Sequence, residues 1–354
     1  MQGKTAGRSF DLNMKRGASM ELLRFWIKNA RYHALGQSVL PSFLAVSLAL
    51  GQPNFSPCLA LMAWFGVTMG HLGCNLFDDY FDFRVRNTSF RNTMDREGMR
   101  ARIAKCQYLT SGEATLGQLL AASCVYCGLS LLAGLLIWLQ RGDPILIIAL
   151  STAFLGLAYS GWPLRLSYHG FGELLVGLVF GPMLMSGVYY AACGSLDSSI
   201  LFIAAPVGLL VMNIVYVHSI MDYEPDKKVG KKTLAVLVDS RRLMLAILAL
   251  VLLLPYLLIV IGMAAGKLSP ANALVFLTLP LAVMLFMFML QYVRDPQKPV
   301  RRRFWMGPMN GWNRVLANGI DWFMLRWFMA RNLLLFFCLS ISAAHLISFL
   351  LGRL

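Results

Sequence analysis

Two clusters of acidic residues interrupt a chain that is otherwise strongly apolar. The first reads Asn75-Leu-Phe-Asp78-Asp79-Tyr-Phe-Asp82, and the spacing of Asn75, Asp78 and Asp82 places them on one face of a helix. Carboxylates this close repel one another unless cations neutralise them. Their oxygens suit Mg²⁺, which binds a few carboxylates together with phosphate oxygens and water. The cluster therefore predicts a Mg²⁺ site, with a solvated acidic helix end as the alternative.

The second cluster combines acids with lysines. It consists of Asp222, Glu224, Asp226, Lys227, Lys228, Lys231 and Lys232. Because Pro225 disfavours helix at the residue before it, we expect a kinked helix end or a loop to present the first and last of these acids. Ammonium groups meet phosphate oxygens as point charges, so lysines beside acids fit a site that binds metal and diphosphate together.

Together the two clusters predict a reaction. Mg²⁺ ions between them would hold an allylic diphosphate, draw electron density from its leaving oxygens and promote ionisation to an allylic carbocation. The aromatic face of Tyr159 would stabilise the cation without trapping it, and an electron-rich acceptor would then form a carbon–carbon bond. The residues expected to act on the diphosphate are Asp78, Asp79, Asp82, Asp222 and Asp226, all but Asp79 as metal ligands.

Membrane-crossing helices must position these clusters. Of the 354 residues, 58% are hydrophobic and only 14% are charged, and the mean hydropathy is +0.62, which excludes a soluble domain. Apolar runs of roughly 20 residues, enough to cross a hydrocarbon layer of about 30 Å, recur along the chain. They cover residues 34–52, 57–77, 116–140, 144–163, 174–192, 200–221, 243–265, 270–293 and 332–351. The sequence predicts an all-α polytopic membrane protein, a bundle of nine transmembrane helices around a central cavity.

The basic residues gather on one side of the predicted membrane. If the spans alternate in direction, 29 of the 32 lysines and arginines share one side, and only Arg141, Lys267 and Arg353 lie on the other. The positive-inside rule then places the N-terminus and both acidic clusters on the cytoplasmic side of the cell (inner) membrane, and the C-terminus outside. The net charge of +15 is explained by attraction to anionic headgroups and substrates, so no nucleic acid is expected as a partner.

The beginning of the chain differs from the rest. Residues 1–19 are polar and basic and contain no apolar signal-peptide core, so we expect a polar tail before a single transmembrane domain over residues 20–354. From residue 20 to 31, charged and apolar residues recur at helical spacing, which predicts a helix lying in the membrane interface. The aromatic and charged residues of the stretch 321–331 indicate a similar interfacial segment before the last span.

Both acidic motifs resemble those of the UbiA superfamily of intramembrane prenyltransferases. Asp78-Asp79-Tyr-Phe-Asp82 is similar to the Asn-Asp-x-x-Asp motif of that family, although an Asp stands where the family usually has Asn. The stretch from Asp222 to Thr233 is similar to its second motif. The resemblance runs from about residue 26 to residue 293.

Further stretches resemble one branch of this family, the 1,4-dihydroxy-2-naphthoate polyprenyltransferases of menaquinone biosynthesis. They are Ala30-Arg31-Tyr-His-Ala-Leu35, Tyr159-Ser-Gly-Trp-Pro-Leu-Arg165-Leu and Gly170-Phe-Gly-Glu173-Leu. In front of Asp222, where this branch often carries Asn residues, the chain has His218 and Ser219.

The resemblance implies a polyprenyl diphosphate donor, an aromatic acceptor, access from membrane lipid, and Mg²⁺ as cofactor. It also implies that Arg31 and Arg165 contact the diphosphate, with positive-inside anchors as the alternative. Glu173 is a candidate for the acceptor site, with a role at the helix N-terminal dipole as the alternative. His218 is a further candidate, because an ionisable residue inside a membrane span is functional by default. The complete set expected to bind substrate is Asn75, Arg31, Tyr159, Arg165, Glu173, His218, Glu224, Lys228, Lys231 and Lys232.

Other functions stay open at this point. A prenyltransferase with another acceptor, such as 4-hydroxybenzoate or another quinone or lipid precursor, would carry the same acidic motifs. An ion-coupled transporter would also contain membrane acids, but these are expected near the bilayer midplane, often in discontinuous helices. Here the acids gather at one membrane face beside lysines, which favours a diphosphate site.

Overall fold

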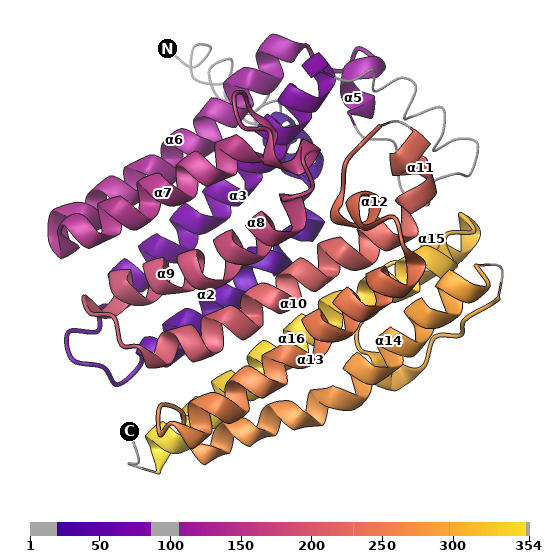
Figure 1. Cartoon of the computed structure of the whole chain (residues 1–354). Coiled ribbons are helices and arrows are strands. Elements are labelled where there is room, and N and C mark those ends of the chain that lie inside the picture. The colour runs from indigo at the N-terminus through magenta and orange to yellow at the C-terminus, as the bar shows by residue number, and fades with distance from the viewer. Residues whose placement is uncertain (1–19, 86–105, 229, 297, 352–354) are drawn as a thin grey trace, which may run out of the picture.

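The computed structural model describes residues 20–85, 106–228, 230–296 and 298–351, and its helices pack into one bundle (Figure 1). Every regular element in these ranges is helical, which confirms the predicted all-α class. After a helix over residues 20–29, the elements are η1 (Tyr32–Ala34), α2 (Gly36–Ala49), α3 (Pro57–Val85), α5 (Gln107–Thr110), α6 (Leu116–Arg141), α7 (Asp143–Ser160), η2 (Leu166–Tyr168), α8 (Gly172–Leu178), η3 (Val179–Met183), α9 (Leu184–Cys193), α10 (Ser199–Met221), α11 (Tyr223–Lys228), α12 (Leu234–Val238), α13 (Arg241–Ala264), η4 (Pro270–Thr278), α14 (Leu279–Arg294), η5 (Phe304–Met306), α15 (Trp312–Ala317) and α16 (Asp321–Leu350). The predicted tail over residues 1–19 lies outside the described residues.

Within the described ranges, eight helical segments are long and apolar enough to cross a membrane, so the chain is a multi-pass membrane protein. They match eight of the expected spans. The remaining one, over residues 34–52, is α-helical only for the 14 residues of α2. At 1.5 Å per residue α2 is about 21 Å long, which is short of a hydrocarbon layer of about 30 Å. A ninth crossing therefore stays a prediction.

Helix α10 forms the centre of the bundle, and 72% of its most apolar stretch is buried. Glycines let two neighbouring elements touch its backbone. A Cβ atom on Gly208 of α10 would lie 2.5 Å from the carbonyl oxygen of Gly177, and a Cβ atom on Gly181 would lie 2.4 Å from the Cα atom of Gly208. The backbones of α8 and η3 thus cross α10 in direct contact, as small residues permit in membrane helices. This crossing holds Glu173, one turn before Gly177, against α10.

Both acidic clusters lie at the same end of the bundle. Helix α3 continues past the expected span to Val85, so the first cluster lies within its last turns. The second cluster begins where α10 ends and continues into α11. In Figure 1 the short helices α5, α11, α12 and α15 all lie at this end, and the C-terminal end of α16 lies at the other. This end carries the candidate site.

The expected separate interfacial segment over residues 321–331 is wrong. These residues form the first turns of α16, which runs without a break to Leu350. Phe323 is 2% exposed and Arg326 is fully buried. Phe323 packs against His218 of α10, and Trp322 packs against Tyr292 of α14. The helix therefore begins before residue 332, the expected start of the span.

Candidate active site

Arg31 holds the first acidic cluster together from outside α3. Its Nη2 atom lies 3.0 Å from Asp78 Oδ2 and 3.3 Å from Asp79 Oδ1, and it also donates to the carbonyl oxygen of Asn75 at 2.6 Å. In return, the Asn75 amide donates to the carbonyl oxygen of Ala30 at 2.9 Å. Partial burial disfavours the charged guanidinium, but the carboxylates of Asp79 and Asp78 outweigh it and raise the pKa of Arg31. The arginine therefore stays cationic beside two carboxylates.

Hydroxyl groups from three other elements donate to the same carboxylates. Ser160, the last residue of α7, donates to Asp78 Oδ1 at 2.5 Å. The hydroxyl of Tyr108 on α5 donates to Asp79 Oδ2 at 3.2 Å, and the hydroxyl of Tyr168 on η2 donates to Asp82. Burial and the charge of Asp79 raise the pKa of Tyr108, so its phenol stays protonated and remains a donor.

Two carboxylates of the second cluster are almost completely buried. Asp222 and Asp226 are each 1% exposed. His218, one turn before Asp222 on α10, places Nε2 2.9 Å from Asp222 Oδ2, and Lys231 Nζ lies 3.5 Å from Asp226 Oδ2. Asp222 itself sits between α10 and α11, and its carbonyl oxygen accepts from the amide of Asp226 at 2.8 Å. Helix α10 ends at Met221 and α11 begins at Tyr223, so the chain is kinked at Asp222 as expected. The expected exclusion of Glu224 from helix by Pro225 is wrong, because Glu224 lies within α11.

Helices α14 and α16 pack against the end of α10 that carries Asp222. The Tyr292 hydroxyl on α14 donates to the carbonyl oxygen of Met221 at 2.9 Å. The guanidinium of Arg326 lies 5.1 Å from the centre of the Tyr292 ring, and its Nε donates to the carbonyl oxygen of Phe288 at 3.0 Å. The ring of Phe323 meets the His218 ring edge to face at 5.1 Å. Helix α14 thus binds Met221, the residue before Asp222, and α16 contacts both Tyr292 and His218.

The stretch from Ser160 to Glu173 contacts the first cluster at its start and α10 at its end. Ser160 and Tyr168 donate to carboxylates of the first cluster. At the other end, Glu173 is 2% exposed and accepts from the Ser219 hydroxyl at 2.6 Å and from the amide of Leu234 at 3.1 Å. Ser219 lies one turn before Asp222. Tyr159, next to Ser160 on α7, packs beside the residue before Glu173: a Cβ atom on Gly172 would lie 3.4 Å from the Tyr159 ring.

Two of the expected cationic residues have unusual backbones. Arg31 and Arg165 both adopt the left-handed conformation, with φ of 60° and 44°. This region is uncommon for residues other than glycine, and such outliers concentrate at binding and catalytic sites. Arg165 is half-buried, and in the described part of the chain its Nε atom is buried without a hydrogen-bond partner. The Arg165 Nε–H group is therefore suited to donate to an anionic ligand.

Other expected residues lie away from the acids. Glu224, Lys228 and Lys232 are exposed. Lys227, the neighbour of Lys228, pairs with Asp239 at 2.6 Å. Of the lysines in the second motif, the structure brings Lys231 to the buried cluster.

The donor set fits a hard divalent cation. The four carboxylates expected to hold metal, Asp78, Asp82, Asp222 and Asp226, come from two groups at one end of the bundle. In the described ranges no three His, Cys, Asp or Glu side chains gather into a complete metal site. Mg²⁺ does not need such a cage, because it usually takes one or two carboxylates and completes its shell with phosphate oxygens and water. These carboxylates therefore suit Mg²⁺ that arrives with a diphosphate.

Several residues of this site had no role assigned to them from the sequence. They are Tyr108, Ser160, Tyr168, Ser219, Tyr292 and Arg326. Only Arg326 gave a local signal, as a charge within an otherwise aromatic stretch. Hydroxyl groups are too common in membrane helices to mark a site, so their roles depend on the fold.

Comparisons with known proteins agree on one family. The model of the UbiA prenyltransferase family matches residues 38–313 of this chain. The 1,4-dihydroxy-2-naphthoate octaprenyltransferase of Bacillus subtilis (strain 168) is 28% identical over 255 residues, which are 71% of this chain and 77% of that protein. UbiA prenyltransferase domain-containing protein 1 of Danio rerio is 30% identical over 315 residues, 88% of each chain.

A solved structure shares the fold. The digeranylgeranylglyceryl phosphate synthase structure superposes with a TM-score of 0.57 at 17% sequence identity. The match covers 91% of this chain and 99% of the synthase.

Proposed function

We propose that this chain, which belongs to the UbiA prenyltransferase family, transfers a polyprenyl group to 1,4-dihydroxy-2-naphthoate in menaquinone biosynthesis. Family membership makes the chain a prenyltransferase, and the naphthoate acceptor is the further step that we infer. Its support is the Bacillus subtilis relative, which is named for that acceptor. One observation carries the proposal: two clusters with buried carboxylates lie at the same end of the bundle, with Arg31 on one of them and Lys231 on the other.

The diphosphate would bind between these clusters. Asp78, Asp82, Asp222 and Asp226 would hold Mg²⁺. When bound, Mg²⁺ offsets the charge of the diphosphate and makes it a better leaving group. Arg31 and Arg165 would contact the same phosphate oxygens, because a guanidinium remains charged and presents several donors in a fixed fork.

The chain's own residues then control the reactive cation. The carbon–oxygen bond to the diphosphate breaks, and the diphosphate leaves with the bonding electrons. A carbon of the acceptor ring then bonds to the allylic cation, and that ring carbon loses its proton, or CO₂ where it carries the carboxylate, to restore the aromatic ring. Tyr159, next to Ser160, which donates to Asp78, would stabilise the allylic cation through its ring face. Glu173 and Ser219 would orient the acceptor from the α8–α10 side of the site, because they form a buried polar pair, with Ser219 one turn before Asp222.

Orientation in the membrane follows from charge. Of the 32 basic residues, 29 belong to the segments expected on one face, and the acidic clusters share that face. We therefore place the active site and the N-terminus in the cytoplasm and the C-terminus outside.

Product identification tests the acceptor. Purified full-length protein is incubated with Mg²⁺, a polyprenyl diphosphate and, separately, 1,4-dihydroxy-2-naphthoate, 4-hydroxybenzoate and a glyceryl phosphate lipid. Mass spectrometry should find prenylated product with the naphthoate at a rate at least tenfold above the others, roughly what one well-placed polar contact contributes. If either of the other two compounds is prenylated faster than the naphthoate, the proposed acceptor is wrong and that compound is the better candidate.

A further inference from the structure

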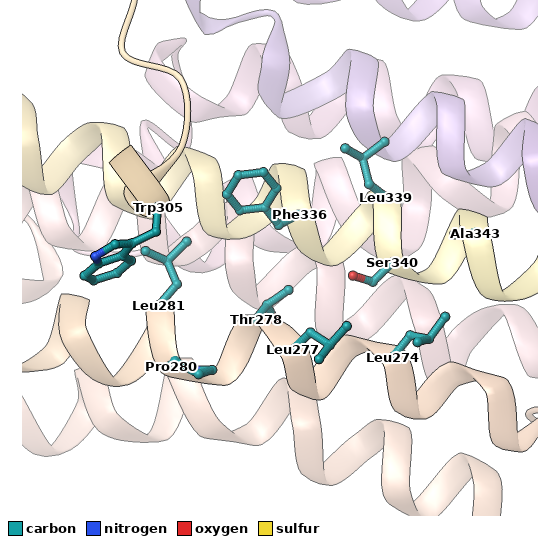
Figure 2. A pocket seen from close by; sticks show the side chains of 10 residues that line it. All are labelled: Leu274, Leu277, Thr278, Pro280, Leu281, Trp305, Phe336, Leu339, Ser340 and Ala343. Carbon is teal, nitrogen blue, oxygen red and sulfur yellow. The ribbon is translucent and has the colours of Figure 1, made fainter. Parts of the chain in front are cut away.

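An apolar groove lies on the bundle away from both acidic clusters. It runs between η4–α14 and α16 with a volume of about 670 Å³ (Figure 2). Its lining includes Leu277, Leu281, Trp305, Phe336, Leu339 and Ala343. The one threonine in it, Thr278, already bonds to Tyr256 and to the carbonyl oxygen of Val275. Ser340 is the other hydroxyl-bearing residue of the lining, so the groove offers an apolar ligand mostly hydrocarbon contact. We call it the α14–α16 groove.

Three consecutive arginines precede the tryptophan that lines this groove. Arg301, Arg302 and Arg303 are all exposed, and none of them forms an ion pair within the described part of the chain. Arg302 stacks its guanidinium on Trp312 at 5.8 Å from the ring centre, which leaves its outer N–H groups open to a ligand. Since Trp305 is only two residues beyond Arg303, three positive charges lie next to the mouth of the groove.

The aromatic residues at this mouth indicate contact with lipid. Phe304 is 94% exposed and Trp305 is 40% exposed, side by side on η5. Aromatic side chains gather at the boundary between headgroups and hydrocarbon, and unpaired guanidinium groups near hydrocarbon are costly unless an anion or water meets them. An amphiphile with an anionic head and an apolar tail satisfies both parts of this surface.

We propose that the α14–α16 groove binds one anionic phospholipid, with its phosphate on Arg301–Arg303 and the upper part of one acyl chain along Trp305 and Leu281. On α16 the lining extends from Phe336 to Ala343, which at 1.5 Å per residue is about 10 Å, or roughly a third of the hydrocarbon layer. Leu277 is 76% exposed, so the groove is open at its side and a chain can enter from the surrounding lipid. Juxtamembrane clusters of basic residues favour anionic over zwitterionic headgroups.

Native mass spectrometry of the full-length protein tests the site. Wild-type protein is titrated with phosphatidylglycerol and, separately, with phosphatidylcholine of the same acyl chains. The headgroup test is the triple substitution R301Q, R302Q and R303Q, and the tail test is A343W, which fills the groove from its exposed side. Matched controls are the triple substitution R24Q, K28Q and R242Q, with the same loss of charge, and L346W on the exposed face of α16.

The expected result is one retained phosphatidylglycerol on the wild type, bound roughly tenfold or more tightly than phosphatidylcholine. The headgroup variant should lose that preference, A343W should lose the lipid, and both controls should keep it. Prenyl transfer should continue in every variant, because none of these residues lies in the active site. Three outcomes would overturn the proposal: equal binding of the two lipids by the wild type, unchanged binding by both test variants, or equal losses in the controls.

Discussion

Replacing Asp78 with Asn removes one negative charge from the first acidic cluster but keeps the shape of the side chain. Asp78 accepts from Ser160 at 2.5 Å through Oδ1 and pairs with Arg31 at 3.0 Å through Oδ2. The amide of Asn can accept at only one of these positions, so one charge-assisted hydrogen bond is lost, at a cost of about 1.5–3 kcal/mol. Asp79 remains 3.3 Å from the guanidinium, so Arg31 keeps a carboxylate partner and we expect the protein to fold.

The effect on catalysis should exceed the effect on folding. If Asp78 holds Mg²⁺ against the diphosphate, D78N should lower kcat/KM on the order of 10²–10⁴-fold. D222N should behave alike, because Asp222 is the counterpart in the second cluster, 2.9 Å from His218. Residues that act on one group as a unit are not additive, so the double variant should lose far less than the product of the two single losses.

The assay is the rate of prenyl transfer as a function of polyprenyl diphosphate concentration, with a thermal melt of each variant. The matched control is D143N, because Asp143 is a carboxylate at the opposite end of α7 that accepts from Trp138 Nε1 at 3.0 Å and, among the described residues, from no other group. Asp197 would be a poorer control, since it accepts from the amide of Ser199 at the start of α10. Near-normal activity in both D78N and D222N would refute the shared diphosphate site.

Three further predictions address the cofactor, the orientation and the support of the acids. Excess EDTA should abolish prenyl transfer and added Mg²⁺ should restore it, and full activity in chelator would contradict a metal-held diphosphate. Cysteine labelling from outside intact cells should reach a cysteine placed at Lys267 but not one at Lys231, and the reverse pattern would invert the topology. Y168F removes the hydroxyl that donates to Asp82, so we expect kcat/KM to fall roughly tenfold with little change in melting temperature; unchanged kcat/KM would show that this contact does not support catalysis.

Some of the site followed from local patterns. The positions of Asn75, Asp78 and Asp82 on one helical face needed only the period of a helix. That both clusters lie at one end of the bundle followed from counting spans, since each span reverses the direction of the chain. The kink at Asp222 was expected from Pro225, but the reason differs: Glu224, the residue before the proline, is helical, and the proline instead lacks an N–H to donate to the carbonyl oxygen one turn earlier.

Other parts of the site could not be read from local patterns. Lys228 and Lys231 are equivalent as sequence, yet only Lys231 reaches Asp226, because the turn after α11 points one side chain inward and leaves the other exposed. Glu173 could equally have faced lipid. Its place against Ser219 depends on the crossing of α8 and α10 through their glycines, which no single segment encodes.

By itself the sequence determined the helical class, eight of the nine expected membrane spans and the two acidic motifs. These are local properties, because the transfer of apolar side chains into lipid and the turn of a helix depend on neighbours within about 20 residues. Only the tertiary structure decided which partners the acids have: Arg31 meets Asp78 across 47 positions, and Arg326 supports the end of α10 from the last helix. A hydrogen bond needs its atoms within about 3 Å, and that depends on how each helix is rotated and how closely it crosses the next.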